Sequence, residues 1–229
     1  MIHIPRHQSV AVLTGAGISV SSGLAPFRGP GGVWNDLDID EVASAQAWQR
    51  NPDRVRSFIN QMRHAARAAS PTPAHVALAR AERARVPPAS FDIITQNVDG
   101  IHRRAGSTRV HEIHGSLHVE RCEACGHRIP WPSPGRCPCG GTFRPHVVLF
   151  GESLPEDVMT DALRALHRCQ WFVAIGTSGV VWPAAGFVLE ARESGATCIN
   201  VNIEPSGNSA FDEELVGPAD EIVPALFAV

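Results

Sequence analysis

Four cysteines lie close together in the sequence and could bind a metal ion. Cys122 and Cys125 form one pair, and Cys137 and Cys139 form a second pair after an interval of 11 residues. Two such pairs supply four thiolates, a ligand set that zinc takes in tetrahedral geometry. Four thiolates leave no coordination position open, so we expect one structural zinc rather than a catalytic one. The alternatives are four free buried thiols and a nucleic-acid-binding zinc ribbon.

Histidine is the main candidate for acid–base chemistry. The chain has no lysine and no tyrosine, which excludes a lysine Schiff base, a phosphate-binding lysine and tyrosine acid–base catalysis. Among 11 histidines, His114 follows Glu112 and precedes Gly115 in a short polar segment. Imidazole titrates near neutral pH, which suits a general base. The residues alone leave open whether His114 is catalytic or structural.

Glycine and polar turns follow several apolar runs. Backbone N–H groups of a turn such as Gly15-Ala-Gly17 can bind phosphate where a helix begins. A plain strand-to-helix turn is the alternative, because no glycine stands at the third position of a GxGxxG motif. Asn97 and Asp99, in the turn 96–100, could bind a ligand or close an Asx turn. Similar turns are Gly176-Thr177-Ser178 and Asn202-Ile203-Glu204.

These turns fit an α/β fold. We expect short buried strands over 9–14, 91–95, 171–175 and 197–201, each ending in a turn, with helical spacing between them. This pattern is typical of an open parallel sheet, which binds ligands at the carboxyl ends of its strands. Residues 35–83 predict two or three helices. Residues 121–144 are rich in Cys, Pro and Gly, so we expect a small insert with little helix or strand.

Composition narrows the class of protein. With 229 residues, 44% of them hydrophobic and 19% charged, the chain is expected to be globular, with one large domain or a domain carrying an insert. The net charge of −3 gives no basic field, so we expect no nucleic-acid partner. No apolar run is long enough for a membrane helix, and the polar start is not typical of a signal peptide. We expect a cytoplasmic monomer, and the arginine- and alanine-rich composition favours a bacterial source.

Taken in order, the motifs resemble the sirtuin family of NAD-dependent protein-lysine deacylases, closest to its bacterial and mitochondrial branch. The resemblance covers residues 11 to about 224. It rests on these segments: Gly15–Ser19, Ser22–Gly29, Thr95–His102, Glu112–Ser116, the four cysteines, Arg144–Glu152, Gly176–Ser178, Val201–Glu204 and Gly217–Ala219.

The resemblance implies a fold and a reaction. A Rossmann-like, parallel-sheet domain would comprise 1–35, 80–119 and 146–229, and a small domain would combine a helical module, 36–79, with a zinc module, 120–145. The active site would lie in the cleft between them. The expected reaction gives nicotinamide, acyl-ADP-ribose and free lysine. Two alternatives remain: mono-ADP-ribosyl transfer or NAD hydrolysis from the same pocket, and an NAD-sensing or zinc-mediated binding module without turnover.

The resemblance also implies roles for residues. His114 would be the base that activates a ribose hydroxyl, with Asn97 and Asp99 beside it as catalytic residues. The positions expected to bind NAD are Gly15, Ala16, Gly17, Phe27, Arg28, Gln96, Asn97, Val98, Asp99, Gly176, Thr177, Ser178, Asn202, Ile203, Glu204 and Ala219. Those expected to contact the acyl-lysine protein or peptide are Ile59, Met62, Val147, Val148, Phe150 and Gly151.

One departure from the family pattern affects substrate choice. Relatives that remove succinyl and malonyl groups carry Tyr and Arg where this chain has Ile59 and Met62. An apolar pair cannot satisfy a buried carboxylate. We therefore expect neutral acyl groups, acetyl or longer, unless Arg63 reaches the same pocket. Leu149 stands where many relatives have Trp, which would loosen the peptide groove.

Overall fold

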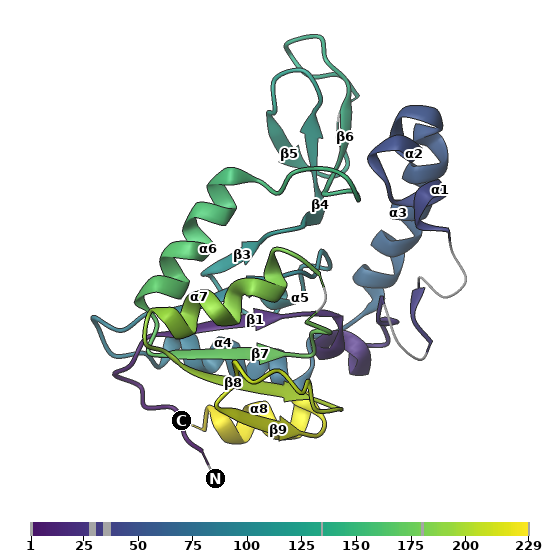
Figure 1. Ribbon diagram of the computed structural model, residues 1–229. Helices are drawn as coiled ribbons and strands as arrows, with labels where there is room; N and C mark the ends of the chain where they lie inside the picture. The colour runs from purple at the N-terminus through teal and green to yellow at the C-terminus, as the bar shows by residue number, and fades with distance from the viewer. Residues whose placement is uncertain (1, 28–30, 34–37, 134, 180, 229) are drawn as a thin grey trace.

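The structure, a computed structural model, describes residues 2–27, 31–33, 38–133, 135–179 and 181–228. A six-stranded sheet in the order β3-β2-β1-β7-β8-β9 forms its centre, and every neighbouring pair is parallel (Figure 1). The expected strands are β1 (Val10–Thr14), β2 (Phe91–Thr95), β7 (Trp171–Ile175) and β8 (Thr197–Asn202). β3 (Val110–Glu112) and β9 (Glu213–Val216) add an edge on each side. The expected Rossmann-like parallel sheet is confirmed.

Helices cover both faces of this sheet. Alternate side chains of β1 point to opposite faces, as the pleat of a strand requires. Val10 and Val12 pack with α4 (Pro73–Arg83) and α8 (Ala219–Leu226), whereas Ala11 and Leu13 pack with α6 (Glu156–Arg168) and α7 (Phe187–Glu193). Because every residue of β1 is buried, this strand has an uninterrupted apolar run instead of a polar–apolar alternation.

The strand order places a switch point between β1 and β7. From β1 the chain builds outward to β2 and β3, and from β7 it builds outward to β8 and β9. In open α/β sheets ligands bind at such a point, beyond the carboxyl ends of the strands. The turns that follow β1 and β7 are therefore the first place to look for a site.

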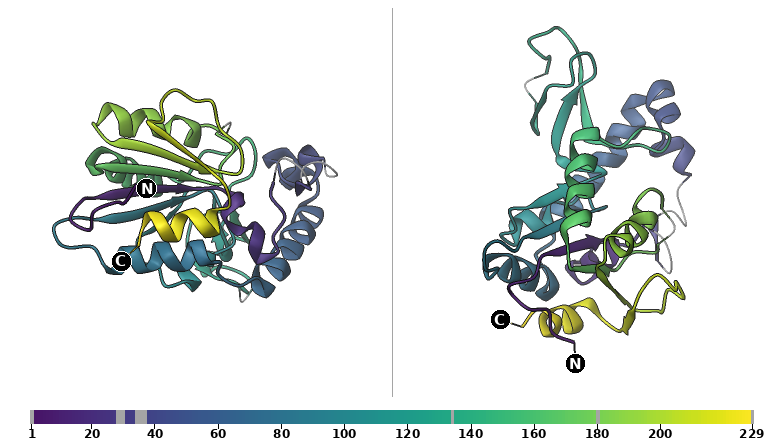
Figure 2. Two further views of the ribbon diagram at one scale, coloured as in Figure 1. Left: turned by 90° about the horizontal axis from the view of Figure 1, so that it is seen from below. Right: turned by 60° about the vertical axis from the view of Figure 1, so that its left-hand side comes forward.

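Residues 35–83 form more helices than expected. The described part of this region contains α1 (Ile39–Val42), α2 (Ala45–Arg50), α3 (Pro52–Ala68) and α4. Side chains of Asp38, Ser44, Asn51 and Thr72 cap their N-termini, which divides the region into short pieces. α1, α2 and α3 stand to one side of the sheet, as Figure 2 shows from below, whereas α4 lies on the sheet.

The expectation that residues 121–144 contain little helix or strand is correct for helix in the described part of this range but wrong for strand. β4 (Gly115–Cys122), β5 (Arg128–Pro130) and β6 (Phe143–Val147) form an antiparallel sheet in the order β5-β4-β6. It projects from the sheet domain beside α1–α3 (Figure 1). β5 has three residues, too few for a strand pattern to be recognised. The remaining short elements are η1 (Ala16–Ser22), α5 (Ile101–Arg104) and η3 (Ala184–Gly186).

Candidate active site

A cleft with a volume of about 800 Å³ lies at the carboxyl ends of β1, β2, β7 and β8. It extends from the turns of the sheet to α3 and to the segment after β6. Nearly all of the residues predicted to bind NAD or substrate line it. They are Gly15, Ala16, Gly17, Phe27, Gln96, Asn97, Val98, His114, Gly176, Thr177, Ser178, Asn202, Ile203, Glu204 and Ala219, together with Ile59, Met62, Val147, Val148, Phe150 and Gly151.

Two predicted residues are not among those that line the cleft. Arg28 lies outside the described residues. Asp99 is only 7% exposed and lies behind the wall of the cleft. Burial raises the pKa of Asp99, although hydrogen bonds from the Ile101 amide and the Ser19 hydroxyl oppose this shift.

The glycines after β1 are required by the close approach of two turns. A Cβ atom on Gly15 would lie 2.6 Å from the carbonyl oxygen of Gly176, and one on Gly17 would lie 2.7 Å from the Gly176 Cα. Gly176 itself has φ of +58°, which favours glycine. The three glycines therefore bring the ends of β1 and β7 together at the switch point and leave backbone as the floor of the cleft.

His114 has the geometry of a general base. Its Nδ1 lies 3.0 Å from the carbonyl oxygen of Gln96. A carbonyl only accepts, so Nδ1 carries the proton and Nε2 keeps a lone pair. Burial lowers the pKa of His114, and the hydrogen bond to Gln96 opposes this shift. The imidazole is therefore neutral at pH 7 and able to accept a proton.

Asn97 is held from both its side chain and its backbone. Its Nδ2 donates to the Gly15 carbonyl over 3.0 Å and lies 3.4 Å from the Ser19 hydroxyl. Its backbone N–H donates to Thr95 Oγ1 over 3.0 Å. Asn97 is 4% exposed, so these contacts fix it at the bottom of the cleft.

Ser19 joins Asn97 to Asp99. Its hydroxyl donates to Asp99 Oδ2 over 2.9 Å, and Asp99 Oδ1 accepts from the Ile101 amide over 2.8 Å. The second contact is the Asx-type turn that the sequence left open. Asp99 thus closes the turn through the Ile101 amide, and through Ser19 it also orients Asn97.

At the other end of the cleft, three predicted residues bond to one another. Gln96 Nε2 donates to Thr177 Oγ1 over 2.9 Å, and Asn202 Nδ2 donates to the Thr177 carbonyl over 3.0 Å. These bonds connect the turns after β2 and β7 to the end of β8. They fix the shape of this half of the cleft independently of any ligand.

The α3 end of the cleft is apolar. Ile59 and Met62 line it together with Val42, Ala43 and Phe58. Among the described residues that line the cleft, none is an arginine, and the chain has no lysine. No described group there can neutralise a ligand carboxylate.

Arg63 does not reach this pocket, because it points to the other side of α3. Its Nε donates to the Leu117 carbonyl over 2.8 Å, and its Nη2 lies 3.5 Å from Glu120 Oε1. Its guanidinium also lies 4.5 Å from the centre of the Trp131 ring. Arg63 is only 2% exposed, and its side chain contacts β4 and the segment after β5.

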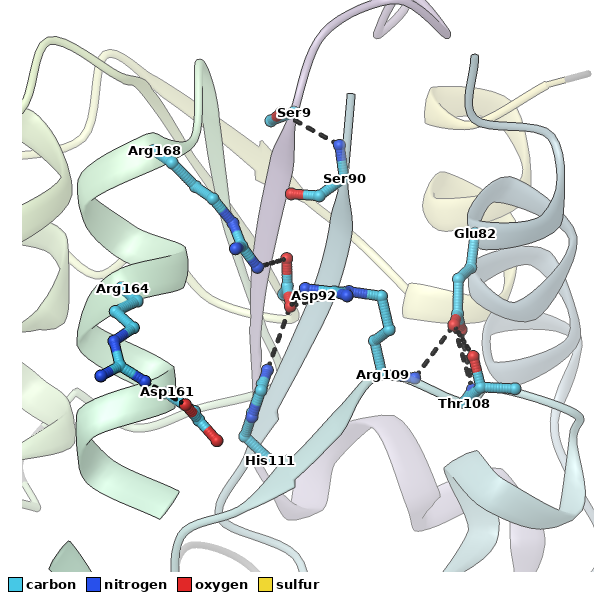
Figure 3. Close-up of polar contacts among 10 residues, drawn as sticks. All are labelled: Ser9, Glu82, Ser90, Asp92, Thr108, Arg109, His111, Asp161, Arg164 and Arg168. Atoms are coloured by element: carbon cyan, nitrogen blue, oxygen red, sulfur yellow. Dashed lines mark hydrogen bonds and ion pairs between the residues drawn. The ribbon is translucent and has the colours of Figure 1, made fainter. Parts of the chain in front are cut away.

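A buried carboxylate anchors the strand that leads to His114. Asp92, in β2, is fully buried and accepts from Arg109, His111 and Arg168 at 2.8, 3.1 and 2.7 Å (Figure 3). Burial alone would raise the pKa of Asp92, but the hydrogen bonds from these three residues lower it far below its usual value. Arg109 and His111 flank the start of β3, so this cluster fixes the edge strand from which the chain runs to His114.

The four cysteines form a tetrahedral donor set. Their sulfur atoms all lie within 4.8 Å of one another, with Cys122–Cys139 at 3.5 Å and Cys125–Cys137 at 3.6 Å. Zn–S bonds of about 2.3 Å place the sulfurs of a tetrahedral site about 3.8 Å apart. No disulfide joins them. The set therefore fits a structural zinc that ties the β4–β5 turn to the loop before β6.

The segment after β6 forms one rim of the cleft. The amides of Val148 and Phe150 donate to the carbonyls of His114 and Ala43, each over 2.9 Å. The Leu149 amide donates to the Glu152 carboxylate over 3.0 Å. This rim is thus bonded to His114 and to the segment after α1, and Leu149 packs in the apolar cluster of α3.

Some residues of the site were missed in the sequence. Trp182 lines the cleft at 72% exposure, and Val20 lines it at 47%. Neither belongs to a periodic pattern or a polar turn, so only the fold brings them there. Ser19 was part of a recognised motif, but its bridge between Asn97 and Asp99 requires the structure.

A Rossmann-like sheet with a cleft at its switch point and a four-cysteine module defines a class of NAD-binding protein. The Sir2 family profile matches residues 15–183. An NAD-dependent protein deacylase from Caulobacter vibrioides is 48% identical over 229 residues, covering 94% of each chain. The mitochondrial deacylase sirtuin-5 of Danio rerio is 36% identical and covers 97% of this chain and 83% of its own.

A solved structure extends the likeness to the fold. A Sir2 protein with a p53 peptide and NAD⁺ has a TM-score of 0.78 and 30% identity, covering 95% of this chain and 91% of its own. The chain belongs to the Sir2 family and is an NAD-dependent protein deacylase, with NAD as its co-substrate. No helix in the described ranges is long and apolar enough to span a membrane.

Proposed function

We propose that this chain removes neutral acyl groups, acetyl or longer, from lysine side chains of protein or peptide substrates. The observation that carries the proposal is the apolar α3 end of the cleft, where Ile59 and Met62 line the wall and Arg63 is held away by Leu117, Glu120 and Trp131. A carboxylate buried there without a partner would cost several kcal/mol. The flexible thioether of Met62 adapts to acyl chains of different length.

In the proposed reaction His114 is the base. Its Nε2 faces the cleft with a free lone pair and takes the proton of a ribose hydroxyl of NAD. Asn97, held by Gly15 and Ser19, orients the nicotinamide end, with Asp99 acting through Ser19. Phe27 covers the reacting ribose and excludes water.

The remaining contacts divide between NAD and the peptide. The turns of the sheet domain bind the adenosine half, through Gly176, Thr177, Ser178, Asn202, Ile203, Glu204 and Ala219. The rim Val147–Gly151 binds an extended substrate segment. A Sir2 structure with a p53 peptide supports a peptide as the kind of substrate. The Val148, Leu149 and Phe150 amides and the Leu149 and Phe150 carbonyls are already bonded. The peptide would therefore pair through other backbone groups of the rim, such as the Val148 carbonyl and the Gly151 amide.

The test compares acyl groups on one peptide. Single-turnover rates are measured with NAD on acetyl-, butyryl- and succinyl-lysine versions. We expect the two neutral groups to be removed at least tenfold faster than succinyl, about the effect of 1.4 kcal/mol. Equal or faster removal of succinyl would overturn the proposal. His114→Ala should abolish turnover of all three.

A pair of variants locates the effect in the pocket. The double variant Ile59→Tyr, Met62→Arg places a hydroxyl and a cation at the α3 end and should raise desuccinylation relative to deacetylation. Gln61→Arg adds the same charge to an exposed position of the same helix and should leave the ratio unchanged. If both variants raised the ratio equally, the general charge of α3 would be responsible rather than the pocket.

A further inference from the structure

A chain of buried hydrogen bonds runs from α5 to the backbone of Asn97. Thr14, at the end of β1, donates its hydroxyl to Thr95 Oγ1 over 2.8 Å, and His102 Nε2 lies 2.9 Å from Thr14 Oγ1. Thr95 Oγ1 also accepts the Asn97 N–H over 3.0 Å. Thr14, Thr95 and His102 are each at most 2% exposed. Solvent therefore cannot replace any member of this chain.

The direction of these bonds fixes the tautomer of His102. Thr14 has one hydroxyl proton and gives it to Thr95, so His102 must donate to Thr14 through an Nε2–H. The Nδ1 atom of His102 is then a bare acceptor. Burial, and secondarily His75, lower the pKa of His102 well below its usual value, so the ring stays neutral.

A second buried histidine favours the same arrangement. The ring centres of His75 and His102 lie 4.6 Å apart. His75 Nδ1 lies 2.9 Å from Thr72 Oγ1 and accepts the Thr72 amide, so the proton of His75 is on Nε2. Neither His75 Nε2 nor His102 Nδ1 has a partner among the described residues. A proton on His102 Nδ1 would add a second unpartnered donor to this interior, which costs free energy.

We propose that His102 is a positioning residue, which acts through Thr14 and Thr95 to hold the Asn97 turn in its reactive position. The inference rests on the proposed role of Asn97 at the nicotinamide end of the cleft. Thr14 and Thr95 lie opposite each other in the β1–β2 register. One imidazole N–H therefore aligns two strand ends and the turn that follows them. The adenosine half has a bond outside this turn, from Asn202 Nδ2 to the Thr177 carbonyl.

Two substitutions at His102 separate positioning from packing. The side-chain nitrogen of glutamine lies as many bonds from Cα as His Nε2, whereas that of asparagine is one bond shorter. His102→Gln should keep the bond to Thr14 and most of the activity. His102→Asn should lower kcat/KM for NAD about tenfold or more, because a small displacement at a reacting centre is costly. Equal activity of the two variants would contradict the proposal.

The affinities of NAD and ADP-ribose provide a readout that a general loss of structure would not reproduce. In His102→Asn, the Kd of NAD should rise, whereas the Kd of ADP-ribose, which lacks nicotinamide, should stay within about twofold. A parallel rise of both constants would show a structural defect and overturn the proposal. Thr14→Val should behave as His102→Asn does, and Thr14→Ser as the wild type does. These two variants test the chain of buried hydrogen bonds if His102→Asn does not fold.

Asn97→Ala distinguishes this inference from the function on which it rests. If Asn97→Ala leaves NAD turnover unchanged, the proposed role of Asn97 fails. If Asn97→Ala lowers turnover but His102→Asn and Thr14→Val do not, the positioning role alone fails.

Discussion

The six-stranded sheet and the four-cysteine module are stabilised by different means. The sheet carries a large apolar cluster on each face, formed by its alternate side chains and four helices. Apart from Leu117, which packs in the apolar cluster of α3, the described buried apolar residues in the core of the module are Cys122, Cys137 and Phe143, with Ile129 packed against them. So small a core cannot hold three short strands. The sheet is therefore stabilised by burial of apolar side chains, whereas the module is expected to depend on the metal bound by its four cysteines.

Removal of the metal is expected to have the largest effect. It should unfold the four-cysteine module and leave the six-stranded sheet folded. Structural zinc contributes about 10 kcal/mol or more to the folding of small modules. A strong chelator should expose the amides of β4 and β5 to hydrogen exchange while those of β1 and β7 stay protected. Loss of protection in both parts at the same rate would show that the module and the sheet fold as one unit.

Cysteine variants provide the matched control for metal removal. Cys139→Ala should lower the zinc content from one ion per chain and reproduce the effect of the chelator. Cys169→Ala removes a buried thiol that packs with the sheet, and it should keep its zinc and lose only about 1 kcal/mol of stability. Zinc loss in Cys169→Ala would contradict the assignment of the four-cysteine site.

The next largest effect should come from Asp92, in the sheet. Asp92→Asn leaves Arg109 and Arg168 without their shared carboxylate. Breaking a buried ion pair costs about 3–5 kcal/mol, and we expect the lower value because both arginines are about half exposed. Urea unfolding of the sheet measures the loss. The zinc content should not change. A change would show that the contacts of Asp92 with Arg109 and Arg168 also stabilise the four-cysteine module.

Asp92 should also impose a pH dependence. Its folded-state pKa is lowered, so its contribution to stability is present above the unfolded pKa of about 4 and is lost as the pH falls toward the folded value. The free energy of unfolding of the wild type should fall below pH 4 more steeply than that of Asp92→Asn. Parallel curves would show that the carboxylate of Asp92 is equally easy to protonate in both states.

These two parts also differ in how well the sequence predicts them. The four buried strands were recognisable because apolar runs end in glycine or polar turns. The edge strands β3 and β9 were not, since Val110–Glu112 and Glu213–Val216 are short and half exposed. In the module, the spacing of the cysteines predicted the ligand set but obscured the strands, because glycine and proline interrupt any alternation.

In the site, too, residues in continuous motifs could be predicted from the sequence, whereas contacts between distant segments could not. The turn residues were predictable because each motif is continuous in the sequence. The direction of Arg63 was not, because its partners Leu117, Glu120 and Trp131 come from the module. The position of Asp99 behind Asn97 likewise depends on Ser19 from η1.

A smaller effect is expected at His114, which lies between β3 of the sheet and β4 of the module. Burial lowers the pKa of His114, so the neutral base persists below the usual histidine value of about 6.5. The acid limb of kcat/KM should therefore have its midpoint below pH 6.5 and fall about tenfold per pH unit beyond it. A midpoint above 6.5 would contradict a buried, neutral His114.

The smallest expected effect concerns the contact through which the module meets α3. The guanidinium groups of Arg63 and Arg67 lie 4.5 and 4.4 Å from the centre of the Trp131 ring. Trp131→Leu should cost about 1 kcal/mol at each arginine contact. A double-mutant cycle with Arg67→Met isolates one of them, since Arg67 is exposed and does not line the cleft. Zero coupling would mean that Arg67 contributes nothing to the contact between α3 and Trp131.

The same variant reports whether this contact affects substrate choice. Met62 precedes Arg63 and lines the α3 end of the cleft, so the two side chains connect this end of the cleft to the module through one turn of α3. If Trp131→Leu lets α3 shift, the rate ratio of butyryl to acetyl removal should change by about twofold, equivalent to about 0.4 kcal/mol. An unchanged ratio with a measurable coupling energy would restrict the module to a role in stability.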